Sequence, residues 1–230
     1  MNTITRTRQG QMNSVRKTSL IAGGLYLLTF VSIPTITLYE DVKKANYLTS
    51  TGSDNAAIVG GILEIIVALA GISTAVVLFP VLKKHNETMA LGLVAARILE
   101  SGTIFVGVAF ILSIVSLRQE GAGADTLATS HALVSLYHRI FLLGQSFMPA
   151  VCDLILGLLL YKSRLVPRII AFIGIIGAPI LVAGYFTVLF GIFERLDPVP
   201  ALSAVPVALF ELSLGIYLII KGLKKSLIKI

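Results

Sequence analysis

The chain has 230 residues, of which 56% are apolar and only 13% are charged, so little of it can form a soluble domain beside a membrane-embedded one. In a soluble protein, the net charge of +7 would suggest that nucleic acid is a binding partner, but here the surplus cations lie at the ends of apolar stretches. Membrane lipids with anionic headgroups are therefore the expected partner, and nucleic acid is not.

Six long apolar stretches follow one another along the chain. Each contains roughly the 20 residues that a helix rising about 1.5 Å per residue needs to cross about 30 Å of hydrocarbon. The sequence therefore predicts an all-α fold, a polytopic membrane bundle of six transmembrane helices in a single domain over residues 19–222. The predicted spans are 19–39, 56–82, 89–117, 131–161, 165–192 and 199–220.

Basic segments flank the predicted domain. The apolar stretch after residues 1–18 is longer than the roughly 7–15 residues of a signal-peptide core, and it lacks a small-residue cleavage pattern. We therefore expect a retained first helix preceded by a mobile cytoplasmic tail over residues 1–18. Residues 223–230 are expected to form a second cytoplasmic basic tail.

Lysine and arginine residues are distributed unequally between the two ends of the predicted helices. Thirteen lie before the first span or after the second, fourth and sixth, and four lie in the alternate loops, so the positive-inside rule places both termini in the cytoplasm. The thirteen are Arg6, Arg8, Arg16, Lys17, Lys83, Lys84, Lys162, Arg164, Arg168, Lys221, Lys224, Lys225 and Lys229, and the four are Lys43, Lys44, Arg118 and Arg195.

Several titratable residues lie within the predicted spans, where insertion scales put the cost of a central charge at about 2.5–3.5 kcal/mol. Counting the helical rise from the cytoplasmic charges places four of them, from three helices, about 13–20 Å into the membrane. These four are Arg97, Glu100, Asp153 and Glu211. Three carboxylates cannot all stay ionised around one guanidinium in a low dielectric, so we expect at least one to hold a proton or a cation.

Three interpretations of this midplane set stay open. The cluster binds a proton, a cation or a small polar solute, as a transporter or a sensor would. Alternatively, Arg97 bridges the acids in a structural clasp, and helix faces rich in small residues support an oligomer or bind a partner protein. The third interpretation is an intramembrane enzyme that acts on lipid or peptide through Asp153 and Glu211, which share a depth but have no accompanying motif.

The fourth span carries a polar strip along one side, which predicts that this side faces protein or water. Pro149 has no backbone N–H to donate, so the carbonyl of Gln145 is left without its helical hydrogen bond. Gln145 therefore joins the candidate binding residues. The strip consists of His138, Arg139, Gln145, Ser146, Pro149, Cys152 and Asp153.

Two further charges lie closer to the outer interface. The helical rise places Glu64 about 28 Å and Arg139 about 34 Å from the cytoplasmic charges of their helices. At that depth we expect them to form a pair or to reach the headgroups.

The sequence carries no motif for a cofactor or a metal. There is no Walker loop, no Gly-x-Ser-x-Gly and no dinucleotide fingerprint on a strand. Cys152 is the only cysteine, which excludes an intramolecular disulfide and a zinc ribbon, and the three histidines do not share a depth with the acids. We therefore expect neither a cofactor nor a metal site, and the enzyme interpretation is the less favoured one.

Two segments carry a family resemblance: ALGLVAARILE at residues 90–100 and LLYKSRLVPRII at residues 159–170. They resemble the hallmarks of an uncharacterised bacterial multi-pass membrane protein family, the domain of unknown function 4386. The resemblance implies a protein of the bacterial cytoplasmic membrane with six spans, and it brings no known substrate, partner or catalytic residue. Arg97 and Glu100 lie inside the more distinctive segment.

Overall fold

The computed structural model describes residues 2–121 and 123–224, with side chains described from residue 14 onward. Throughout these residues the chain is helical, without a strand, and six segments are long and apolar enough to cross a membrane, which confirms the predicted fold class. The six segments are Ser14–Leu38, Asn55–Leu82, Glu87–Glu120, Ala124–Ser163, Arg168–Leu189 and Pro198–Ile220.

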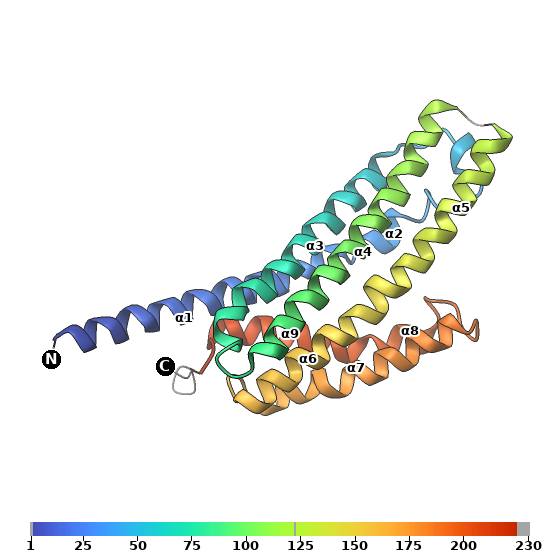
Figure 1. The fold of residues 1–230 in the computed structure, drawn as a ribbon. Coiled ribbons are helices and arrows are strands. Elements are labelled where there is room, and N and C mark those ends of the chain that lie inside the picture. Colours follow the sequence, from blue (N-terminus) through green and yellow to red (C-terminus); the bar gives the residue numbers. More distant parts are fainter. Residues whose placement is uncertain (1, 122, 225–230) are drawn as a thin grey trace.

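Three of the six segments consist of more than one helix (Figure 1). The first contains α1 (Asn2–Leu28), the short 3-10 helix η1 (Thr29–Ser32) and α2 (Thr35–Leu38). The next two are α3 (Asn55–Leu82) and α4 (Glu87–Glu120), and η2 (Tyr47–Thr49) lies in the loop before α3. The fourth contains α5 (Ala124–Phe141), the π-helical segment η3 (Leu142–Phe147) and α6 (Met148–Ser163). The fifth is α7 (Arg168–Leu189), and the sixth contains α8 (Pro198–Ser203) and α9 (Val205–Ile220).

The first segment departs from the prediction in two ways. It breaks at η1, because Pro34 lacks an N–H donor and the hydroxyls of Thr29 and Ser32 donate to the carbonyls of Tyr26 (2.7 Å) and Thr29 (3.2 Å). Moreover, the helix α1 begins at Asn2, so residues 2–18 are continuous with the first membrane helix. The mobility of that segment stays a prediction, and residues 225–230 of the second predicted tail lie outside the described residues.

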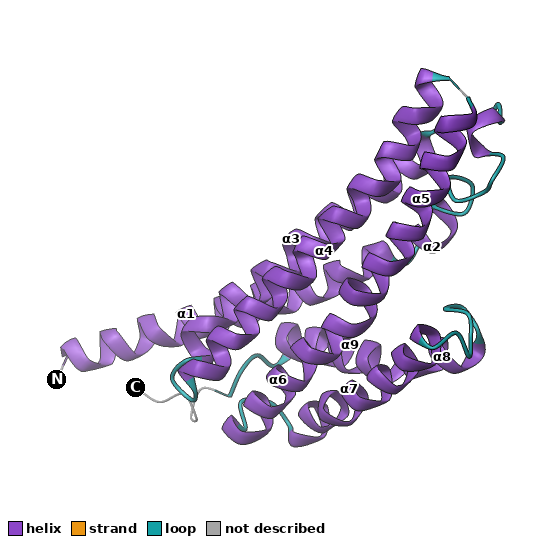
Figure 2. Ribbon diagram, turned by 45° about the vertical axis from the view of Figure 1, so that its right-hand side comes forward, coloured by secondary structure: helices purple, strands orange, loops and turns teal. Residues whose placement is uncertain are grey.

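The bundle has two different ends. We call the end that carries Lys83, Lys162, Arg168 and Lys221 the basic end, and the end that carries residues 40–54, Gly121, Gly123 and residues 190–197 the loop end. Figure 2 shows α3, α4 and α5 running together toward the loop end while α7 and α8 diverge from them.

Apolar cores differ between the two ends. The largest core closes the half of the bundle at the basic end, with side chains contributed by nearly every span. Its large, fully buried members are Tyr26, Leu78, Leu82, Leu93, Leu156, Leu159, Leu160 and Phe210. A second core at the loop end packs the segment 40–54 against α3, α4 and α5 through Tyr39, Tyr47 and Tyr137.

A polar contact fastens the loop end. Tyr47 Oη donates to Asp54 Oδ1 at 2.5 Å, and Arg118 Nη1 donates to the same oxygen at 2.7 Å. The hydrogen bond from Tyr47, aided by those from Gln119 and Arg118, holds the pKa of Asp54 below its usual value. Arg118 also donates to the backbone carbonyls of Ser50 and Gly52, so the loop before α3 is tied to the end of α4.

The first and last spans pack together at the basic end. A Cβ atom on Gly23 of α1 would lie 2.7 Å from the carbonyl oxygen of Gly215 on α9, so the two helices touch backbone to backbone. Arg16 donates to the carbonyls of Leu218 (3.2 Å) and Ile219 (2.5 Å), which α9 leaves unpaired at its last turn.

Glycines in α3 and α7 serve the same kind of packing. Gly61 of α3 faces Val108 of α4, while Gly174 and Gly177 of α7 face Phe210 and Pro206 of α9. These small-residue faces are therefore occupied within the chain, and an oligomer formed through them stays a prediction.

Candidate functional site

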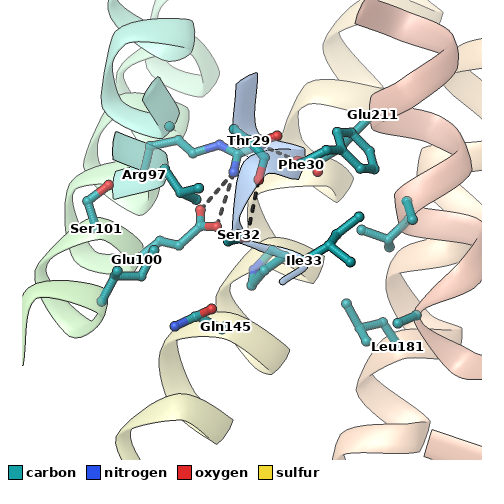
Figure 3. Close-up of a pocket in the computed structure, with 17 residues that line it drawn as sticks. Thr29, Phe30, Ser32, Ile33, Arg97, Glu100, Ser101, Gln145, Leu181 and Glu211 are labelled. Carbon is teal, nitrogen blue, oxygen red and sulfur yellow. Dashed lines mark hydrogen bonds and ion pairs between the residues drawn. The ribbon is translucent and has the colours of Figure 1, made fainter. Parts of the chain in front are cut away.

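Arg97 lies at the centre of a buried polar cluster formed by α4, α6 and α9. Only 3% of Arg97 is exposed, and its Nη1 donates to both carboxylate oxygens of Glu100, at 2.9 and 3.1 Å. Its Nη2 donates to Glu211 Oε1 at 2.9 Å, and Figure 3 shows Glu100 and Glu211 beside the guanidinium. The same Nη2 donates to Asp153 Oδ1 at 3.4 Å. The structure thus brings together the four residues that the sequence placed at one depth.

Charge within this cluster is unbalanced. Among the described residues, Arg97 is the one basic group in contact with the three acids, so full ionisation would leave two uncompensated negative charges. Cys152 Sγ donates to Glu100 Oε2 at 3.3 Å, and the Tyr26 ring lies 5.9 Å from the guanidinium carbon. Burial makes such an imbalance costly, because a charge in low dielectric needs a partner.

Two atoms of the cluster lack partners. Asp153 Oδ2 and Arg97 Nε are both buried without a hydrogen bond to any of the described residues. Native interiors pair most buried polar groups. The cluster is therefore not a closed set of satisfied contacts.

A cavity of about 270 Å³ lies beside the cluster. The side chains of Glu100 and Glu211 line it and are 11% and 15% exposed, whereas Asp153 lies outside the lining and is fully buried. Within the described part of the chain, no hydrogen bond or ion pair engages Glu211 Oε2, so this oxygen is available to a ligand. Figure 3 shows η1 along the cavity, with Glu100 and Gln145 from the opposite helices.

Gln145 reaches the cavity from η3. The π-helical turn before Pro149 widens the backbone here, as such turns often do at functional sites. Gln145 Nε2 donates to Glu64 Oε1 at 3.3 Å, and Tyr39 Oη donates to Glu64 Oε2 at 3.4 Å. The polar contacts of Glu64 are thus directed into the bundle.

Arg139 lies elsewhere. It is exposed and lines a separate cavity of about 470 Å³ at the loop end, together with His138, Glu194 and Arg195. No ion pair joins it to Glu64, so the expected outer pair is absent from the described contacts. The helical rise gives the height of a residue, but it does not give the direction in which the side chain points.

Sequence reasoning missed the contribution of the first span. Thr29, Phe30, Ser32 and Ile33 of the first span line the cavity, although none of them is titratable. The local signal was present, because hydroxyl residues ahead of Pro34 favour an irregular turn inside an apolar stretch.

Comparisons with known proteins identify a family and no relative of known activity. The family model described as Domain of unknown function (DUF4386) matches residues 21–222, a range that includes all four cluster residues. Neither a curated protein nor a solved structure matches the chain. In the described residues, no group of three or more His, Cys, Asp or Glu side chains is arranged to hold a metal ion.

Proposed function

We propose that this multi-pass membrane protein, which belongs to the DUF4386 family, binds a small cationic solute or a proton at the acids around Arg97. The observation that carries the proposal is the presence of three carboxyl groups around one guanidinium, two of them buried and the third partly exposed, beside a cavity. A cation or a proton on the acids would offset the uncompensated charge. Binding of this kind would serve a transporter or a sensor equally.

The accessibility of Glu211 favours a binding site over a purely structural clasp. A clasp needs each acid to be satisfied within the protein, but Glu211 presents one oxygen to the cavity. The geometry gives less support to an intramembrane enzyme. Arg97 Nη2 donates to both Asp153 and Glu211, so the guanidinium occupies the position where a pair of catalytic carboxyls would share a proton.

Replacing Glu211 with glutamine is expected to weaken cation binding while preserving the fold. The amide oxygen of Glu211→Gln still accepts from Arg97, but the negative charge facing the cavity is lost. Losing a charge-assisted hydrogen bond of about 1.5–3 kcal/mol weakens binding roughly 10- to 100-fold. Titration calorimetry with ethylammonium on the purified full chain measures the change.

The matched control is Glu194→Gln, which removes an exposed acid at the loop end. Equal binding by the wild type and Glu211→Gln, together with the absence of a protonated-carboxyl infrared band assignable to Glu211 at neutral pH, would contradict the proposal. An infrared band lost in Glu211→Gln, without ethylammonium binding, would identify the proton as the bound cation.

We also propose that the protein resides in a bacterial cytoplasmic membrane with both termini in the cytoplasm. The support is the charge asymmetry, because thirteen basic residues belong to one end of the helices and four to the other. The basic end would then lie against the anionic cytoplasmic leaflet.

A labelling experiment tests this orientation. A cysteine at the exposed position Thr51 should react with a membrane-impermeant maleimide added to intact cells, whereas one at Lys224 should react only after permeabilisation. The native Cys152 is fully buried, so the background is expected to be low. Labelling at Lys224 but not at Thr51 in intact cells would reverse the topology.

A further inference from the structure

A second cavity continues the one beside the acids. It has a volume of about 300 Å³ and shares Gln145, Leu181 and Ala204 with the cluster cavity. Its other walls come from Ile36 of α2, Tyr185 of α7 and the α8 segment. The two cavities therefore follow the same boundary, with η1 and α2 on one side and α8 and the start of α9 on the other.

This boundary opens sideways. The first span packs along α9 only at the basic end; nearer the loop end, η1 and α2 pack on α3, whereas α8 packs on α7. Ile33 lines the cavity beside the acids, and Ile36 lines the second cavity. Because Ile33 is 59% and Ile36 is 45% exposed, both residues lie at the mouth. Ala204 lines both cavities from the other side and is also exposed.

The surface around this mouth is apolar and lies within the spans. Ile33 and Ile36 are large, exposed apolar residues on one edge, and Leu202 and Val205, which flank Ala204 in the sequence, are large, exposed apolar residues on the other. Exposed apolar residues at membrane depth contact lipid acyl chains. The mouth consequently opens toward the bilayer.

The alternative route, from water at the loop end, offers a cation no net attraction. The loop-end cavity shares Leu142, Val188 and Arg195 with the second cavity, and its charged lining is balanced, with Arg139 and Arg195 against Glu194 and Asp197. A hydrophilic cation arriving by this route has to pass Arg195, which lines both cavities, before it reaches the acids around Arg97.

We infer that the ligand is an amphipathic amine, taken up sideways from the bilayer between η1–α2 and α8–α9. This inference rests on the proposed function and names its substrate class. The ammonium group would pair with Glu211 and Glu100 at the inner end of the cavity. The apolar body of the amine would lie against Phe30, Ile33 and Leu181, which form the walls toward the mouth.

A series of ligands tests the inference on the wild-type chain in lipid nanodiscs. We expect hexylammonium to bind at least tenfold more tightly than ethylammonium, after correction for partition into empty nanodiscs, because each buried methylene contributes about 0.8 kcal/mol. Hexane-1,6-diammonium has the same length with a second charge, and it should bind at least tenfold more weakly than hexylammonium. Equal affinities for the three ligands would overturn the inference.

A variant at the mouth supplies the second readout. Ala204→Trp should slow association of hexylammonium at least tenfold, while Leu212→Trp, on the exposed side of α9 and outside the cavity linings, should leave it unchanged. Since the chain has no tryptophan, the fluorescence of each variant also reports whether it is folded. Unchanged association in folded Ala204→Trp would overturn the lateral route.

The outcomes separate the inference from the proposed function. Binding of ethylammonium that depends on Glu211, without a gain from the longer chain, would leave the proposed function standing and remove the amphipathic ligand. Absence of Glu211-dependent binding for both ethylammonium and hexylammonium would remove the cationic-solute form of the proposal and this inference together.

Discussion

Arg97→Ala is expected to destabilise the folded protein by roughly 3–5 kcal/mol, because removing one partner of a buried ion pair leaves uncompensated charge behind. Here a single guanidinium contacts carboxyl groups from three helices, so its loss affects Glu100, Asp153 and Glu211 at once. Unfolding of the purified protein in mixed micelles of increasing denaturing-detergent content measures the difference.

Arg139→Ala is the matched control. Arg139 lies in another span of the same bundle, but it is exposed and makes no ion pair with a described residue. Its removal is expected to change the free energy of unfolding by less than about 0.5 kcal/mol, as is usual for a surface substitution. Similar effects for the two substitutions would show that the Arg97 cluster does not hold the helices together.

Arg97→Lys should recover only part of the stability that Arg97→Ala loses, since an ammonium group lacks the planar fork that reaches several carboxylates.

Gly23→Ala should destabilise the bundle by roughly 1–3 kcal/mol, the usual cost of overpacking. The added Cβ would lie 2.7 Å from the Gly215 carbonyl oxygen and 2.8 Å from Ile219 Cγ1, so α1 and α9 would have to separate. Backbone atoms of a packed helix yield less readily than the end of a flexible side chain.

Its neighbour Gly24 provides the control. A Cβ at Gly24 meets nothing within 4 Å, and the residue is exposed on the same helix. Gly24→Ala is the same glycine-to-alanine change as Gly23→Ala. Alanine is favoured over glycine in a helix by about 1 kcal/mol, so Gly24→Ala should be neutral or slightly stabilising. The same detergent titration applies, and equal stability of the two variants would show that the α1–α9 contact is looser than described.

The depth of the charges was predictable from the sequence, and their neighbours were predictable only in part. Arg97, Asp153 and Glu211 meet because all three combine one depth with a position on an inward helix face, where ionised groups in a membrane protein are expected to lie. The pairing of Glu64 with Arg139 was expected on depth alone. In the structure, Glu64 turns inward to Gln145 and Tyr39, the latter from a loop segment whose folded position no helical count provides.

Helix boundaries show the same limit. The fourth membrane segment begins at Ala124, whereas the sequence predicted a start at residue 131. The prediction was late because the first two turns of the helix carry polar residues such as Asp125 and Thr129, which hydropathy assigns to a loop. Hydropathy identifies only the part of a helix that lies in the hydrocarbon. The helix α5 continues beyond that part and packs against α4. The cavity between η1 and α9 depends on how the helices cross, which is a property of tertiary packing and not of any one segment.

The contact between the first and last spans can form only late in synthesis. Arg16 and Ser19 bond to groups about 200 positions later in the chain, at Leu218 and Leu223. At roughly 5–20 residues per second, α1 is made some 10–40 s before α9 is available to it. Until α9 is made, Arg97 has no contact from Glu211, whereas α3, the other long helix that packs on α1 in the folded protein, is already available. The cluster around Arg97 is thus completed only by α9, and a nascent chain that stops before residue 205 lacks both Glu211 and the α9 part of the wall opposite η1.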